Sequence, residues 1–111
     1  MKDTLLHNPR CSKSRGALEL VGDAVPVRRY LEDPLSLDEL RDLVKLLGVR
    51  PIEITRTGEA RFQELGLTNQ SSDEEVLRAI AENPILLERP ILIRNGKAIV
   101  GRPPERLREL L

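Results

Sequence analysis

The segment LLHNPRCSKSRGAL, residues 5–18, contains the only cysteine and the only histidine of the chain. Cys11 follows a proline turn and precedes a helical spacing of apolar residues, so we expect a helix to begin at or just after it. The unpaired N–H groups and the positive dipole end of that helix would favour a thiolate. A lone cysteine is most often an inert core residue. Because Cys11 falls on a polar turn, we predict a nucleophile instead.

The neighbours of Cys11 extend this chemistry. Arg10, Lys13 and Arg15 supply positive charges near the sulfur, although not all three can face it from a helix. Ser14 lies on the same helix face as Cys11, where its hydroxyl can donate to the thiolate or to a bound oxyanion. His7 is either a group that tunes the thiol or transfers a proton, or a structural histidine at a strand end. Helix N–H groups also bind anions, so the loop predicts a nucleophile beside a site for a tetrahedral oxyanion.

Composition limits the remaining possibilities. A chain of 111 residues with 40% hydrophobic content predicts one domain over residues 1–111. Basic and acidic side chains balance at 18 each, and Tyr30 and Phe62 are the only aromatic residues, so we expect no nucleic-acid partner. We also expect no metal site, because no His, Cys and Asp cluster has ligand spacing. The single cysteine and the short apolar runs predict a cytoplasmic protein that does not span a membrane.

Strand and helix patterns alternate in the first third of the chain. DTLL, residues 3–6, predicts a short strand, and the spacing over residues 14–21 predicts a helix that ends near Gly22. AVPVRRYL, residues 24–31, predicts a second strand, with Pro26 near its start or on an edge.

The middle third predicts helices. Two capping boxes, each a serine followed three residues later by a glutamate, begin two of them. These boxes are Ser36 with Glu39 and Ser72 with Glu75. The first helix is expected to end at Gly48 and the second at Asn83, and residues 51–66 between them predict a helix-rich loop region.

The last third predicts a hairpin and a final helix. In PILIRNGKAIVG, residues 90–101, two β-rich runs flank Asn95-Gly96, which is typical of a type I′ turn. The final helix is expected to begin at Pro103 or Pro104, with three leucines on one face: Leu107, Leu110 and Leu111. A βαβ unit followed by ββα predicts an α/β, thioredoxin-like fold around a mixed sheet, with an all-helical insertion between the halves.

Several of these motifs also carry a family resemblance. HNPRCSKSRGAL, residues 7–18, resembles the active-site loop of the ArsC family, the glutaredoxin-dependent arsenate reductases and their close relatives. YLEDPLSLDELRDLVKLLG, NPILLERPILI and VGRPPERL follow in the expected order, so the resemblance covers nearly the whole chain. It implies that Cys11 attacks arsenate or a similar oxyanion. It also implies glutathione as co-substrate and glutaredoxin as partner, with no bound cofactor.

The resemblance further implies individual site residues. Three arginines would bind the oxyanion: Arg56 in EITRTGEA, Arg89 in ERPILI and Arg102 in VGRPPE. A cis peptide bond would precede Pro90, and the loop histidine and serine of the family fall on His7 and Ser14. Ser12 stands where arsenate reductases usually carry glycine, and RCSKSR is more typical of the uncharacterised branch of the family.

Two other functions stay open on the sequence. The Spx transcriptional regulators, which contact RNA polymerase, have similar sequences. They commonly carry a CxxC pair, whereas Ser14 occupies the second position here. A glutathione-linked thiol oxidoreductase that acts on a substrate other than arsenate is the second alternative.

Overall fold

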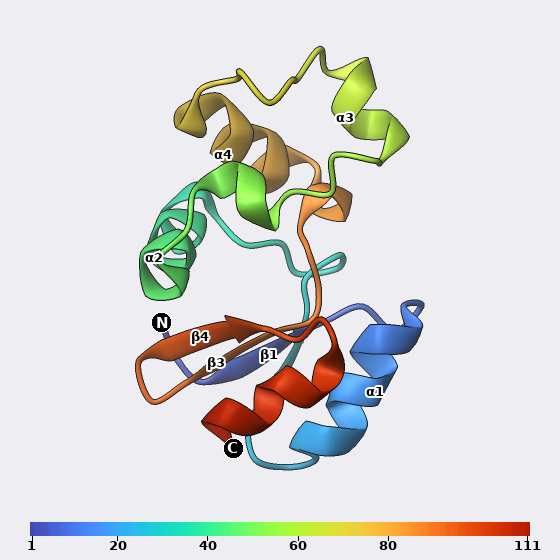
Figure 1. Cartoon of the computed structure of the whole chain (residues 1–111), viewed down its shortest axis with the longest axis vertical. Helices are drawn as coiled ribbons and strands as arrows, with labels where there is room; N and C mark the ends of the chain where they lie inside the picture. Colours follow the sequence, from blue (N-terminus) through green and yellow to red (C-terminus); the bar gives the residue numbers. More distant parts are fainter. The chain divides into compact units, whose positions relative to one another are not determined.

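The computed structural model describes all 111 residues, and they form two compact units. One unit consists of Met1–Asp33 and Arg89–Leu111, and the other of Pro34–Glu88. The first contains the sheet and the second is built from helices (Figure 1). None of the helices combines the length and the apolarity needed to span a bilayer.

The first unit contains a four-stranded mixed sheet with the order β2-β1-β3-β4. Its strands are β1 (Thr4–His7), β2 (Val27–Arg29), β3 (Ile91–Arg94) and β4 (Lys97–Val100). β1 runs parallel to β2 and antiparallel to β3, and β3 runs antiparallel to β4. The predicted mixed sheet is therefore confirmed.

The second strand is shorter than predicted. Pro26 has no N–H to give to the ladder and lies just before β2, where its carbonyl accepts from the Leu5 N–H at 2.9 Å. At the other end, the N–H groups of Glu32 and Asp33 both donate to the Arg29 carbonyl. This tight turn ends the strand at Arg29.

Two helices cover one face of the sheet (Figure 1). α1 (Ser12–Val21) begins after Cys11 and ends at Gly22, as predicted. The C-terminal helix η3 (Pro104–Leu110) is a 3₁₀ helix. The core between sheet and helices consists of Leu5, Ala17, Val21, Val25, Leu92 and Leu107.

Two predictions about the C-terminal third have different outcomes. Asn95 (φ 54°) and Gly96 (φ 74°) both have left-handed backbones, which confirms the type I′ turn. The prediction that Leu111 shares the buried face of the final helix is wrong, because its side chain is 45% exposed. A 3₁₀ helix repeats every three residues, so Leu107 and Leu110 align and Leu111 does not.

The second unit contains the all-helical insertion that the sequence predicts. Its elements are α2 (Leu37–Leu47), η1 (Pro51–Ile54), α3 (Ala60–Glu64), α4 (Asp73–Glu82) and η2 (Pro84–Leu86). Ser36 and Glu39 form both bonds of the first capping box, at 3.1 and 2.9 Å. Only one of the two hydrogen bonds of the second capping box is present. Ser72 accepts the Glu75 N–H, but the Glu75 carboxylate accepts from the Ser72 hydroxyl rather than from its N–H.

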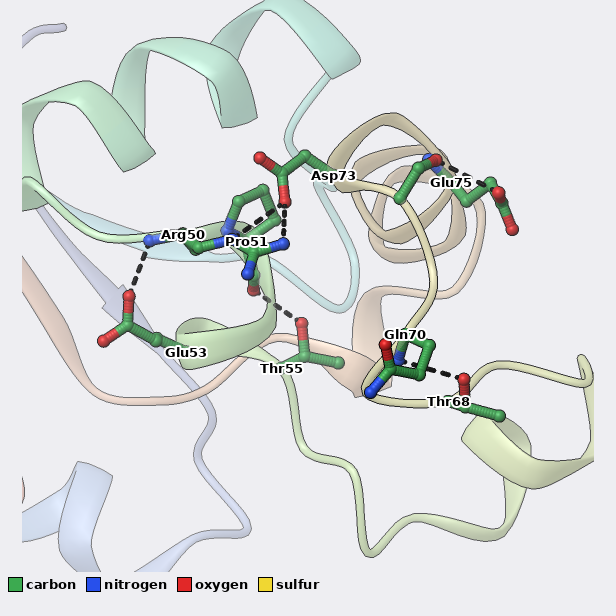
Figure 2. A network of polar contacts seen from close by, with 9 residues as sticks. Arg50, Pro51, Glu53, Thr55, Thr68, Gln70, Asp73 and Glu75 are labelled. Atoms are coloured by element: carbon green, nitrogen blue, oxygen red, sulfur yellow. Dashed lines mark hydrogen bonds and ion pairs between the residues drawn. The ribbon is translucent and has the colours of Figure 1, made fainter.

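Polar contacts tie η1 to the start of α4 inside this unit (Figure 2). The Arg50 guanidinium donates to the Asp73 carboxylate at 3.0 Å, and the Arg50 N–H donates to Glu53 at 2.7 Å. The Thr55 hydroxyl donates to the Pro51 carbonyl at 2.7 Å and closes the turn. These contacts hold the segment that leads into Arg56.

Candidate active site

Cys11 occupies the N-cap position of α1, with an extended backbone (φ −96°, ψ 123°). Its carbonyl accepts the first helical bond from the Arg15 N–H at 2.9 Å, and its N–H donates to the Asn8 carbonyl at 3.0 Å. The side chain is half-buried. The sulfur therefore lies at the positive end of the helix, as the sequence predicts.

The pKa of the Cys11 thiol lies below its ordinary value. Burial acts in the opposite direction and raises the pKa. The Ser14 N–H, the Arg89 guanidinium and the Lys13 N–H each donate to the sulfur and together outweigh that effect. The cation that acts on the sulfur comes from Arg89, 78 positions further along the chain. The sequence had suggested the side chains of Arg10, Lys13 and Arg15, which are all exposed.

Ser14 contributes through its backbone rather than its hydroxyl. Its side chain is fully buried, with Oγ 2.7 Å from Nδ1 of His7. The same oxygen accepts the Asn8 N–H at 2.9 Å. No hydrogen bond joins the hydroxyl to Cys11, so the contact expected from the sequence is replaced by one from the N–H.

His7 is buried at the end of β1, and its pKa lies below the ordinary value. Burial is the largest cause, followed by the positive charge of Arg29, while the contact with Ser14 partly offsets both. The imidazole is therefore neutral at neutral pH and acts as a hydrogen-bonding partner of Ser14. No cluster of three His, Cys, Asp or Glu side chains that suits a metal ion is present.

Asn8 is a residue of this site that the sequence analysis missed. It is buried, and its Oδ1 accepts the Arg10 N–H at 3.0 Å, which makes an Asx turn before the cysteine. Its carbonyl and its N–H bind Cys11 and Ser14. An Asn before Pro is a known turn signal, so the HNP sequence contained the information.

Two of the three predicted arginines lie in the first unit with Cys11. The Arg89 guanidinium reaches the thiol, and the bond from Arg89 to Pro90 is cis, as the resemblance implies. The Arg102 guanidinium donates to the Arg89 carbonyl at 3.0 Å. The structure therefore brings Arg89 and Arg102 together at the start and the end of the hairpin.

Arg56 lies in the second unit, where it is ion-paired. Its guanidinium contacts the carboxylates of Glu59 at 3.1 Å and Glu88 at 3.2 Å. Burial lowers the pKa of Arg56, but the two carboxylates raise it above its ordinary value. The three side chains line a pocket of about 420 Å³ together with Thr55, Thr57 and Gly58.

Comparisons with known proteins agree on one family. The model of the ArsC family matches residues 6–110. An arsenate reductase of Neisseria meningitidis serogroup A is 47% identical over 112 residues, which cover 96% of each chain. The uncharacterized protein YfgD of Escherichia coli K12 is 46% identical over 112 residues, which cover 96% of this chain and 94% of YfgD.

A solved structure agrees with these matches. The arsenate reductase from Vibrio cholerae is 40% identical, covers all of both chains and superposes with a TM-score of 0.88. This similarity confirms the predicted thioredoxin-like fold with its helical insertion.

Proposed function

Because the chain belongs to the ArsC family, we propose that it is an arsenate reductase whose nucleophile is the Cys11 thiolate. One observation carries the proposal. The sulfur lies at the N-cap of α1 with the Arg89 guanidinium in hydrogen-bonding reach. N–H groups and a cation that favour a thiolate also attract an oxyanion to the same place.

Arsenate would be held by the first N–H groups of α1 and by Arg89 and Arg102. A guanidinium offers two parallel donors to two oxygens, so this pair suits a tetrahedral anion. We propose Arg56 as the third arginine on the basis of the family resemblance. Its two carboxylate partners mean that it must exchange at least one of them for an arsenate oxygen.

In the first step, the Cys11 thiolate attacks arsenic and an S–As bond forms. One arsenate oxygen takes up protons and leaves as water, while the arginines stabilise the charge on the remaining oxygens. Arsenic stays in oxidation state V in this step. The product is a covalent thiol–arsenate adduct on Cys11.

The second step needs a thiol from outside, because Cys11 is the only cysteine. A glutathione thiolate attacks the Cys11 sulfur, an S–S bond forms, and the S–As bond breaks with its electron pair on arsenic. This reduces arsenic from V to III, and arsenite leaves. Glutaredoxin then attacks the mixed disulfide and takes the glutathione, which restores the Cys11 thiolate. The need for reduced glutathione supports a cytoplasmic location.

The test is arsenite formation by the purified protein with arsenate, glutathione and glutaredoxin. We expect turnover in the wild type and none in Cys11→Ser, because serine does not form the low-pKa nucleophile. Mass spectrometry should detect a glutathione adduct on Cys11 that depends on arsenate. Because the side chain is half-buried and serine is similar in size, the free energy of unfolding of Cys11→Ser should change by about 1 kcal/mol or less.

Other results would support the alternatives. A wild type that forms no arsenate-dependent adduct but binds RNA polymerase in a pull-down would be a regulator of the Spx type. Glutathione exchange on Cys11 without arsenate turnover would indicate an oxidoreductase for another substrate.

A further inference from the structure

A second pocket, of about 200 Å³, lies in the first unit beside the loop that carries Cys11. It is lined by Asn8, Pro9, Arg10, Arg29, Leu31 and Glu32. The first three residues form the turn that immediately precedes Cys11. The last three come from the end of β2 and the turn after it. The proposed mechanism assigns nothing to this pocket.

The sheet explains why these two segments meet. β1 and β2 are parallel neighbours, with His7 paired to Arg29 at their last positions. The segments that follow the two strands therefore leave the sheet at the same end, the carboxyl end of β1 and β2. In α/β folds, ligands bind in the crevice outside the carboxyl ends of parallel strands. Cys11, the N-cap of α1, lies at this same end of the sheet, since the Asn8 carbonyl accepts its N–H.

The charged side chains of the pocket are available to a ligand. Arg10, Arg29 and Glu32 are all exposed, and no ion pair joins any of them to another side chain. The neighbouring Arg28, by contrast, is paired with Asp33 at 3.4 Å. Leu31 is 37% exposed and adds an apolar surface. The pocket thus offers two positive charges, one negative charge and a short apolar wall.

We propose that this pocket binds the γ-glutamyl end of glutathione, an inference that rests on the proposed function. That end carries an α-carboxylate and an α-ammonium group, separated from the thiol by two methylenes, an amide and the Cα and Cβ of the cysteinyl residue. Arg10 and Arg29 would bind the carboxylate, and Glu32 would bind the ammonium group. Glutathione carries one net negative charge, which matches the one net positive charge of the pocket.

Size and position agree with this assignment. Ligand pockets commonly measure roughly 300–1,000 Å³, so about 200 Å³ fits one end of a tripeptide rather than all of it. Arg10 is the residue next to Cys11 in the chain, so a γ-glutamyl group held there leaves the cysteinyl sulfur beside Cys11. The pocket would therefore orient glutathione for attack on the Cys11 sulfur.

The test compares two disulfides as substrates of Cys11, oxidised glutathione and neutral hydroxyethyl disulfide. In both reactions the Cys11 thiolate attacks one sulfur, a mixed disulfide forms on Cys11, and the other half leaves as a thiolate. Mass spectrometry follows the formation of each mixed disulfide and gives the two rate constants. A change in the reactivity of Cys11 itself alters both rate constants equally, so it does not alter their ratio. The ratio therefore measures recognition of the glutathione moiety.

We expect the wild type to prefer oxidised glutathione. Arg29→Gln and Glu32→Gln should each reduce the ratio by about two- to fivefold, as expected for exposed charge pairs. Lys97→Gln is the matched control. Lys97 is exposed and lies at the end of the sheet where β1 begins, whereas the pocket lies at the end where β1 stops at His7. The ratio of this control variant should equal that of the wild type.

Truncated disulfides identify the end of the tripeptide that binds. The disulfide of γ-glutamylcysteine should keep the preference, and that of cysteinylglycine should lose it. The reverse order would overturn the γ-glutamyl assignment, as would a ratio that Arg29→Gln and Glu32→Gln leave unchanged.

Failure of this inference is distinguishable from failure of the proposed function. If the ratio is unchanged in the variants while the wild type reduces arsenate, the pocket assignment fails and the reductase stands. If the ratio falls in the variants while the wild type does not reduce arsenate, the glutathione pocket stands and the reductase proposal fails.

Discussion

Oγ of Ser14 lies 2.7 Å from Nδ1 of His7, although one residue is inside a helix and the other ends a strand. Both side chains are buried, and the Asn8 N–H donates to the same oxygen. This contact fixes the end of β1 against the first turn of α1. The Ser14 hydroxyl therefore stabilises the loop that carries Cys11, while the Ser14 N–H lowers the pKa of the Cys11 thiol.

Ser14→Ala should separate these two roles. The variant leaves the Asn8 N–H and the His7 ring without their shared partner, so the free energy of unfolding should fall by about 1–3 kcal/mol. The pKa of Cys11 should stay below its ordinary value, because the backbone N–H remains. Urea unfolding and thiolate absorbance against pH measure the two effects. Ser12→Ala, at an exposed position, is the control. A return of the Cys11 pKa to the ordinary thiol value would show that the hydroxyl acts on the sulfur.

The depressed pKa of His7 predicts a loss of stability in mild acid. The unfolded chain protonates near 6.5, whereas the folded imidazole resists protonation until a lower pH. The unfolded state therefore binds more protons over this interval, and the free energy of unfolding falls as the pH drops from about 6.5 to the folded pKa. Above about 6.5 the group contributes no pH dependence, because both states are neutral.

This pH effect is best measured in a Cys11→Ser background, because the Cys11 thiolate also titrates. Its folded pKa is depressed, so it contributes stability at high pH that is lost as the pH falls through that pKa. In the Cys11→Ser background, His7→Gln should flatten the acid-side decline in the urea midpoint. A folded His7 pKa above 6.5 by NMR would contradict the prediction.

Local patterns in the sequence were sufficient to predict the features that depend on neighbouring residues. The start of α1 at Cys11, the capping box of Ser36 and the Asn95-Gly96 turn each depend on a few adjacent residues, and all three are confirmed. The contact of Arg89 with Cys11 depends on strand pairing between distant segments. It followed from the family resemblance, since spacing along the chain carries no information about it.

The sequence did not predict where β2 ends or how Leu111 is oriented, for physical reasons. The end of β2 depends on which N–H groups bind the Arg29 carbonyl, and the orientation of Leu111 depends on a 3₁₀ rather than an α repeat. Neither choice is visible in a hydrophobic pattern. That residues 1–111 behave as one domain stays a prediction, and one unfolding transition shared by probes in both units would test it.

Arg89 should control the ionisation of Cys11. Arg89→Gln removes a donor and a charge from the thiolate, so the pKa of Cys11 should rise toward its ordinary value. Arg89→Lys should be partly tolerated, because lysine keeps the charge but loses the planar fork. The rate of alkylation against pH measures both variants, and Arg106→Gln, at an exposed site, is the control. An unchanged pKa in Arg89→Gln would exclude Arg89 from this role.

Gly101 should be required for the packing that supports Arg89 and Arg102. A Cβ at this position would lie 2.9 Å from the Leu107 side chain and 3.0 Å from the Pro90 ring. The Gly101 N–H also donates to the Pro90 carbonyl at 2.9 Å, so Pro90 cannot withdraw without losing this bond.

We therefore expect Gly101→Ala to lower the free energy of unfolding by about 1–3 kcal/mol through overpacking. Because Pro90 and residue 101 adjoin the two arginines, the affinity for sulfate or arsenate should fall as well. For the free energy of unfolding, Gly58→Ala is the matched control, since no atom lies within 4 Å of its Cβ. In a double-mutant cycle, Leu107→Ala should make Gly101→Ala less damaging, because it removes the nearest clash. Strictly additive losses in that cycle would mean that the contact with Leu107 is not the cause.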